Sequence, residues 1–210
     1  MIKNVMVLLS GGPDSLSEAL YQLEEKNKKV HLVTLVPGNS FLYAENQKEI
    51  LARCGYDFTS EVCYFHKPNG IYGETLLASI PTLAEIIVRN NIDEVYTGGS
   101  TDDENETLPW QEMAEILAKY VYILSKKHII VDPESRKIPT KQEVHTFLGP
   151  LWDFTHSCVV STEPCKRCHK CNQRRRAGSQ ESKLKWQEKD MTAITQWIGS
   201  ETFKELKNHM

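Results

Sequence analysis

The sequence predicts an α/β protein: a doubly wound parallel sheet of five strands with helices on both faces, followed by a small zinc-binding helical subdomain. Three observations predict this. Short β-branched apolar runs alternate with longer segments of helical period, which is typical of parallel strands joined by crossover helices. The alternation stops after Trp152, and four cysteines gather between Cys158 and Cys171. We therefore expect a main domain at residues 1–150 and a zinc-binding helical region at residues 151–210.

Each expected strand contains β-branched or aromatic residues, which favour extended backbone. The strands are expected, in chain order, at residues 4–9, 30–36, 57–64, 94–97 and 128–131. The helices between them are expected at residues 15–25, 44–54, 72–90 and 110–124. A fifth, short helix should begin after Thr140, because Thr140-Lys-Gln-Glu143 has the spacing of a capping box.

Length and composition limit the remaining alternatives. With 210 residues, of which 40% are hydrophobic, the chain can bury a substantial core but is short for two full domains. The formal net charge of −3 gives no global reason to expect a nucleic-acid or membrane partner. Neither a signal-peptide pattern nor a run of about 20 apolar residues is present, so a soluble cytoplasmic protein is expected.

A glycine-rich turn joins the first expected strand to the first helix. Its residues are Ser10-Gly11-Gly12-Pro13-Asp14-Ser15. In a doubly wound sheet this turn lies at the carboxyl edge, where the amino terminus of the next helix faces a bound ligand. The glycines allow backbone N–H groups to approach an anion, the serines add hydroxyl donors, and Asp14 can hold Mg²⁺ or cap the helix. The turn therefore predicts a phosphate site.

This segment resembles the SGGxDS loop of the N-type ATP pyrophosphatases, also called PP-loop enzymes. Those enzymes cleave ATP between the α- and β-phosphates, transfer AMP to a substrate oxygen and release pyrophosphate. The resemblance implies that Ser10, Gly11, Gly12, Asp14 and Ser15 bind ATP and pyrophosphate, with Mg²⁺ present and with Asp14 among the catalytic residues.

A second segment fits the same class. Pro139-Thr140-Lys141 resembles the proline-then-lysine segment in which the family's lysine reaches the phosphates. The positive end of a helix dipole disfavours a cation in the first turn, so a lysine at this position is unusual unless an anion is near. Lys141 is therefore expected to bind the phosphates and to take part in catalysis.

The cysteine cluster predicts a metal site. Cys158, Cys165, Cys168 and Cys171 supply four thiols within 14 residues, enough for a closed and therefore structural tetrahedral zinc site. An iron–sulfur cluster is the rival interpretation. His156 and His169 are expected near the metal or at the surface, whereas Cys54 and Cys63 are expected to be buried hydrophobic residues.

Within the PP-loop class, the cysteine spacing selects one branch. Ser157-Cys158 followed by Cys165-x-x-Cys168-x-x-Cys171-x-x-Arg174-x-x-Ala177 is similar to the carboxyl-terminal signature of 7-cyano-7-deazaguanine synthases. This resemblance implies adenylation of the carboxylate of 7-carboxy-7-deazaguanine, attack by ammonia to give the amide, and a second ATP-driven dehydration to the nitrile.

The segments expected to face the acyl substrate diverge from the family pattern. Residues 36–40 read Val-Pro-Gly-Asn-Ser where the family has Tyr-Gly-Gln-Arg-His, and Pro109-Trp110 stands near the family's later substrate signature. Asp102 and Asp103 begin a carboxylate cluster that can bind Mg²⁺ or substrate, and this cluster is similar to the Asp-Asp-x-x-Glu-Thr of PP-loop enzymes that modify tRNA.

Several functions therefore stay open beside the nitrile-forming synthase. One is a synthase-like enzyme that conjugates the activated deazaguanine to another amine, such as a protein, as in bacterial antiviral operons. A tRNA-modifying enzyme ranks third, since the basic residues around the cysteines lack interleaved aromatic residues. A zinc-binding module without catalysis is the alternative outside enzymes, and a homodimer is also open. The basic residues are Lys166, Arg167, Lys170, Arg174, Arg175 and Arg176.

Overall fold

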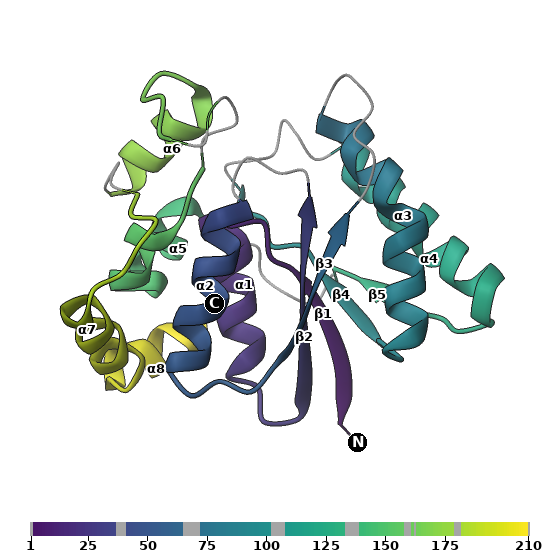
Figure 1. The fold of residues 1–210 in the computed structure, drawn as a ribbon, viewed down its shortest axis with the longest axis horizontal. Coiled ribbons are helices and arrows are strands. Elements are labelled where there is room, and N and C mark those ends of the chain that lie inside the picture. The colour runs from purple at the N-terminus through teal and green to yellow at the C-terminus, as the bar shows by residue number, and fades with distance from the viewer. Residues whose placement is uncertain are drawn as a thin grey trace.

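The strands form one parallel five-stranded sheet (Figure 1). The computed structural model describes residues 2–36, 41–64, 72–101, 108–132, 139–157, 161, 163–178 and 182–209. The strands are β1 Lys3–Leu8, β2 Lys28–Val36, β3 Thr59–Tyr64, β4 Glu94–Tyr96 and β5 Ile130–Val131. All neighbours pair in parallel, in the order β3-β2-β1-β4-β5. The strand order reverses between β1 and β4, and ligands of open α/β sheets bind at the carboxyl ends of such a pair.

All five expected strands and the five expected helices occur in the predicted order, with ends that differ by a few residues. The helices of the sheet region are α1 Pro13–Leu23, α2 Phe41–Arg53, α3 Tyr72–Arg89, α4 Leu108–Ser125 and α5 Lys141–Leu148. They are followed by the 3-10 helix η2 Gly149–Phe154 and by α6 His169–Ala177, α7 Glu188–Ile198 and α8 Glu201–His209. Thr140 caps α5 as predicted, since both bonds of its capping box with Glu143 are present.

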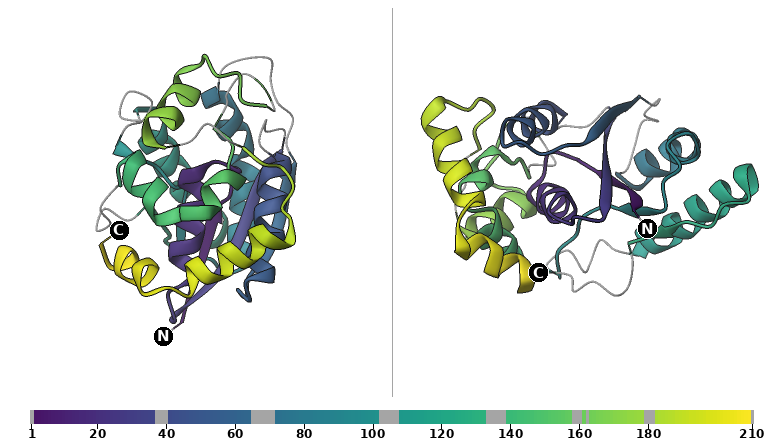
Figure 2. Two further views of the ribbon diagram at one scale, coloured as in Figure 1. Left: turned by 90° about the vertical axis from the view of Figure 1, so that its left-hand side faces the viewer. Right: turned by 90° about the horizontal axis from the view of Figure 1, so that it is seen from below.

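The side chains of β1 alternate between two buried clusters, as the period of a strand requires. Val5 and Val7 belong to a cluster that contains residues of α1 and α2, whereas Met6 and Leu8 belong to one that contains residues of α3 and α4. Figures 1 and 2 show α1, α2 and α5 on one side of the sheet and α3 and α4 on the other. Burial on both sides explains the almost uninterrupted apolar sequence of β1.

The last two helices pack on the segment around α5, with α7 against η2 and α8 against α5. Phe203 of α8 stacks on Phe147 of α5 with ring centroids 5.0 Å apart, and both rings are buried in the same cluster as Leu20 and Trp152. This cluster contains residues from both expected regions, so the division at residue 150 stays a prediction. Within the described part of the chain, no helix is long and apolar enough to cross a membrane.

One buried histidine of the sheet predicts a pH-dependent stability. Burial lowers the pKa of His31, whose Nδ1 lies 2.6 Å from Thr59 Oγ1, although Glu61 acts in the opposite direction. The unfolded chain therefore binds this proton more readily than the folded one, and stability falls as the pH decreases below about 6.5. Burial and Arg174 lower the pKa of His145 as well, with the same sign.

We expect the free energy of unfolding in urea to decrease between about pH 6.5 and pH 5 and the variant His31→Gln to show a smaller decrease. His209, whose side chain is exposed, provides the control variant His209→Gln. A slope that is identical in wild type and His31→Gln would contradict this assignment.

Candidate functional site

Serine hydroxyls fold the loop between β1 and α1 onto itself. Ser10 Oγ and Ser15 Oγ lie 2.9 Å apart, the Ser10 N–H donates to Ser15 Oγ at 3.1 Å, and the Ser15 hydroxyl donates to Gly12 O at 3.1 Å. The Gly12 N–H is directed at Ser10 Oγ, 3.3 Å away. Gly11 has a φ of +84°, which a residue with a side chain rarely adopts. The loop is thus closed by a small ring of hydrogen bonds at the amino end of α1.

The start of α1 differs from the expectation. The helix begins at Pro13 rather than at Ser15, and its N-cap is Gly12, which has extended backbone and no capping side chain. Asp14 therefore lies in the first turn, and the expectation that it caps the helix is wrong. Proline suits this turn because an N–H group at this position would have no intrahelical acceptor, so its absence costs nothing.

Asp14 and Lys141 form an ion pair although 127 positions separate them in the sequence. The ammonium Nζ of Lys141 donates to Asp14 Oδ2, and Lys141 is only 5% exposed. Asp14 Oδ1 is buried and has no hydrogen-bond partner in the described part of the chain. The first turn of α5 therefore places a buried cation beside the loop that follows β1.

The segment after β4 forms the other side of this site. Its backbone meets the segment before α5, because the Thr101 N–H donates to Pro139 O at 3.0 Å. The end of β4 is also fixed by Asp132, whose carboxylate accepts from the Thr97 N–H at 2.9 Å and from its hydroxyl at 2.6 Å. The sequence analysis missed Asp132, since nothing in its neighbourhood indicated a partner on β4. Asp102 and Asp103 lie outside the described residues.

Gly98, which follows β4, allows a close contact with the first turn of α1. Its φ is +70°, and a Cβ atom at this position would lie 2.7 Å from Asp14 O and 2.8 Å from Ser15 Cα. Backbone atoms of α1 cannot yield as a flexible side chain would. A Cβ atom at the neighbouring Gly99 would have no heavy atom of the described residues within 4 Å, its own chain neighbours apart.

We expect Gly98→Ala to lower the free energy of unfolding by about 2 kcal/mol, through backbone strain and this contact. Gly99→Ala, the matched control, should change it by less than about 0.5 kcal/mol. Urea unfolding of both variants measures the difference, and equal effects at the two positions would contradict the close approach.

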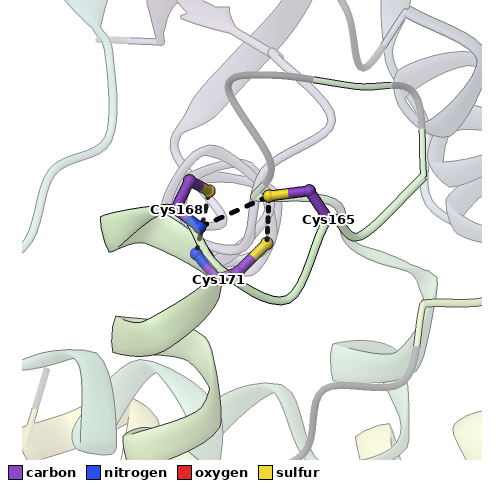
Figure 3. A group of neighbouring side chains, drawn as sticks. All are labelled: Cys165, Cys168 and Cys171. Atoms are coloured by element: carbon purple, nitrogen blue, oxygen red, sulfur yellow. Dashed lines mark hydrogen bonds between the residues drawn. The ribbon is translucent and has the colours of Figure 1, made fainter.

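Three cysteines converge where α6 begins (Figure 3). The sulfur atoms of Cys165, Cys168 and Cys171 all lie within 4.8 Å of one another, and Cys165 Sγ is 3.9 Å from Cys171 Sγ. A tetrahedral zinc site with zinc–sulfur bonds of about 2.3 Å requires sulfur atoms about 3.8 Å apart. Within the described part of the chain none of the three forms a disulfide, and Cys158 lies outside it.

The backbone around these sulfurs suits thiolates. The Cys168 N–H donates to Cys165 Sγ at 3.3 Å, and the Cys171 N–H donates to Cys168 Sγ at 3.4 Å. Cys168 is the N-cap of α6, where the helix dipole also favours negative charge. Because hydrogen bonds to the charged form stabilise that form, the cluster can hold a metal ion such as zinc.

Only part of the expected basic surface is exposed. Lys166, Arg167, Arg175 and Arg176 are exposed, but Arg174 is 2% exposed, and its guanidinium lies 4.5 Å from the centre of the Trp152 ring. Burial lowers the pKa of Arg174 to about 10. The expectation that Arg174 belongs to this surface is wrong, because it lies one turn from the buried Cys171 on the same side of α6.

Two further residues of the site were not predicted from the sequence. The side chain of Gln47 on α2 donates to both Gly11 O and Phe154 O at 2.9 Å, and it is 1% exposed. His156, expected near the metal or at the surface, is buried, so the surface alternative is wrong. Its ring stacks on Tyr43, and its backbone N–H donates to Gly11 O at 2.8 Å. The spacing of Gln47 from Ala44, Ile50 and Leu51, which are buried on the same helix, was the one signal that could have shown its side to be buried.

Comparison of the chain with family models and with curated proteins finds no match.

Proposed function

We propose that this chain is a PP-loop ATP pyrophosphatase, doubly wound and with a C-terminal zinc-binding region, that resembles 7-cyano-7-deazaguanine synthases. One observation carries the proposal most directly. Lys141 and Asp14, distant in sequence, meet beside the Ser10–Ser15 loop at the carboxyl end of β1, where the class binds triphosphate. A cation, a carboxylate and a ring of backbone and hydroxyl donors are the groups that a magnesium triphosphate requires.

Each residue has a role in this proposal. The loop residues Ser10, Gly11, Gly12 and Ser15 hold the departing pyrophosphate, and Lys141 neutralises the phosphates as a compact charge. Asp14 fits Mg²⁺, because its buried Oδ1 has no partner within the described residues and Mg²⁺ uses one or two carboxylates together with phosphate oxygens. When bound, Mg²⁺ would offset the negative charge that develops on the leaving pyrophosphate.

The resting ion pair has a consequence for ATP binding. Lys141 occupies Oδ2 of Asp14, so the lysine must exchange this carboxylate for phosphate oxygens when the nucleotide binds. Mg²⁺ then replaces the ammonium beside Asp14, and both cations face the negative charge of the phosphates.

The proposed reaction begins with attack of the substrate carboxylate on the α-phosphorus, which breaks the bond to pyrophosphate. Ammonia then attacks the acyl carbon of the adenylate, and AMP leaves with one former carboxylate oxygen. A second ATP activates the amide oxygen in the same way, so that loss of AMP gives the nitrile. Zinc at Cys165, Cys168 and Cys171, with Cys158 as fourth ligand, has a structural role because a closed site leaves no open position.

A second function is favoured by the divergent substrate segments. Residues 36–40 and Pro109-Trp110 depart from the family pattern, and these positions are expected to select the nucleophile. A pocket open to larger amines would let the activated deazaguanine carboxylate react with a protein amine instead of ammonia.

Product analysis distinguishes the two functions. The protein is incubated with ATP, 7-carboxy-7-deazaguanine and ammonium, and the products are resolved by mass spectrometry. We expect AMP, pyrophosphate and mainly the nitrile. Adenylate or amide that accumulates, together with a mass increase on a protein offered as acceptor, would favour the conjugating enzyme, and ADP with orthophosphate would contradict both.

A further inference from the structure

Arg174 connects the metal-binding helix to the segment that precedes the cysteine cluster. It lies on α6 three positions after Cys171, so the two side chains occupy the same side of the helix. Its Nη1 donates to the hydroxyl of Thr155, and its Nη2 donates to Trp152 O at 2.7 Å. The guanidinium also lies over the Trp152 ring, and burial from water strengthens these contacts.

The segment that Arg174 contacts, residues 152–156, in turn contacts the loop Ser10–Ser15, here called the phosphate loop. The residue after Thr155 is His156, whose backbone N–H donates to Gly11 O at 2.8 Å. Gln47 donates to the same carbonyl and to Phe154 O, which ties the segment and the loop to α2. Gly11 O therefore accepts two hydrogen bonds from groups that Arg174 and Gln47 keep in place.

The orientation of the Gly11 carbonyl determines the direction of the next N–H. A trans peptide is planar, so the Gly12 N–H points away from Gly11 O and into the ring around Ser10. If His156 moved, the peptide between the two glycines could rotate, because glycine resists such rotation least. The anion-binding form of the loop would then be one conformation among several.

We infer that Arg174 is a positioning residue, through which the metal-binding helix keeps the phosphate loop in its anion-binding form. Metal bound to Cys168 and Cys171 fixes the first turn of α6, the arginine fixes Thr155 and His156, and His156 fixes Gly11. The metal would then affect nucleotide affinity without contact with the nucleotide. The anion-binding role of the loop and the effect on nucleotide affinity rest on the proposed function, whereas the coupling of metal, arginine and loop does not depend on the ligand.

The test compares Arg174→Met and Arg174→Lys with the control Arg175→Met, whose side chain is exposed on the same helix. Hydrogen exchange is measured at the amides of Gly12 and His156 in the zinc-loaded protein without nucleotide. We expect exchange about 3- to 30-fold faster in Arg174→Met, the range of coupling between linked sites, with partial recovery in Arg174→Lys. Arg175→Met should match the wild type.

Removal of the metal from the wild type by a chelator provides a second measurement if Arg174→Met does not fold. The same two amides should then exchange faster than in the zinc-loaded protein, whereas exchange in the middle of β1 should change less. Unchanged exchange at Gly12 and His156 in the folded arginine variant or in the metal-free wild type would overturn the inference.

Calorimetry with magnesium ATP separates this inference from the proposed function. ATP affinity about 3- to 30-fold lower in Arg174→Met supports both. Absence of ATP binding to the wild type, with faster amide exchange in the variant, would contradict the function and support the coupling. Equal ATP affinity and equal exchange in wild type and variant would contradict the coupling alone.

Discussion

Replacement of Lys141 by alanine is expected to reduce the rate of pyrophosphate release from ATP by about 100-fold or more. Preorganised charges directed at a developing anion in a site shielded from water contribute on this scale. Lys141 is buried, and its ammonium already contacts Asp14 beside the loop, so its charge acts in a shielded environment. Asp14→Asn should reduce the rate as well, since the amide removes the carboxylate proposed to hold Mg²⁺.

The control for Lys141→Ala is Lys3→Ala. Lys3 also pairs with a carboxylate, Glu94, at 2.5 Å, but this pair lies where β1 and β4 begin, at the opposite edge of the sheet. Its removal should leave the rate of pyrophosphate release within about twofold of the wild type. A folded Lys141→Ala protein that releases pyrophosphate at the wild-type rate would show that Lys141 takes no part in the reaction.

The second large effect concerns zinc. Purified protein is expected to contain one zinc ion per chain, and Cys171→Ser should lower the melting temperature by about 10 °C. Loss of a structural metal is among the few changes that cost more than about 4 kcal/mol, and each kcal/mol lowers the melting temperature by about 2–4 °C in a domain of this size. Differential scanning calorimetry and elemental analysis measure the two quantities.

Cys54→Ser is the matched control, because Cys54 is a free, half-buried thiol outside the cluster. It should retain the zinc and change the melting temperature only slightly. A wild-type protein whose melting temperature is the same with and without zinc would exclude the structural zinc site. A chromophore typical of iron–sulfur clusters would exclude it as well.

The alternation of apolar runs and helical segments was sufficient to predict every strand of the sheet and the order of the first five helices. Local sequence was sufficient there because burial on both faces leaves uninterrupted apolar runs, as in β1. The start of α1 was misplaced by two residues because Gly12 caps the helix by its extended backbone alone. The capping box at Thr140 was predicted correctly, since both of its bonds join residues three positions apart.

Contacts between distant segments could not be read from local pattern. Nothing near Gln47 indicates that its side chain reaches Gly11 and Phe154, because these partners are 36 and 107 positions away. The burial of Arg174 was readable in principle. Cys171, Arg174 and Ala177 are spaced by three residues and are all buried, which is the period of one helix face. The three consecutive arginines at residues 174–176 instead suggested an exposed basic surface.

The central claim is that an oxygen of the substrate attacks the α-phosphorus of ATP at the loop after β1. It is tested most directly with 7-carboxy-7-deazaguanine labelled with ¹⁸O in its carboxylate, in the presence of ATP and ammonium. The account predicts that each AMP carries one ¹⁸O atom, with two labelled AMP molecules for each carboxylate converted to the nitrile, and that pyrophosphate carries none. Unlabelled AMP, or ADP and orthophosphate as the products of ATP, would contradict it.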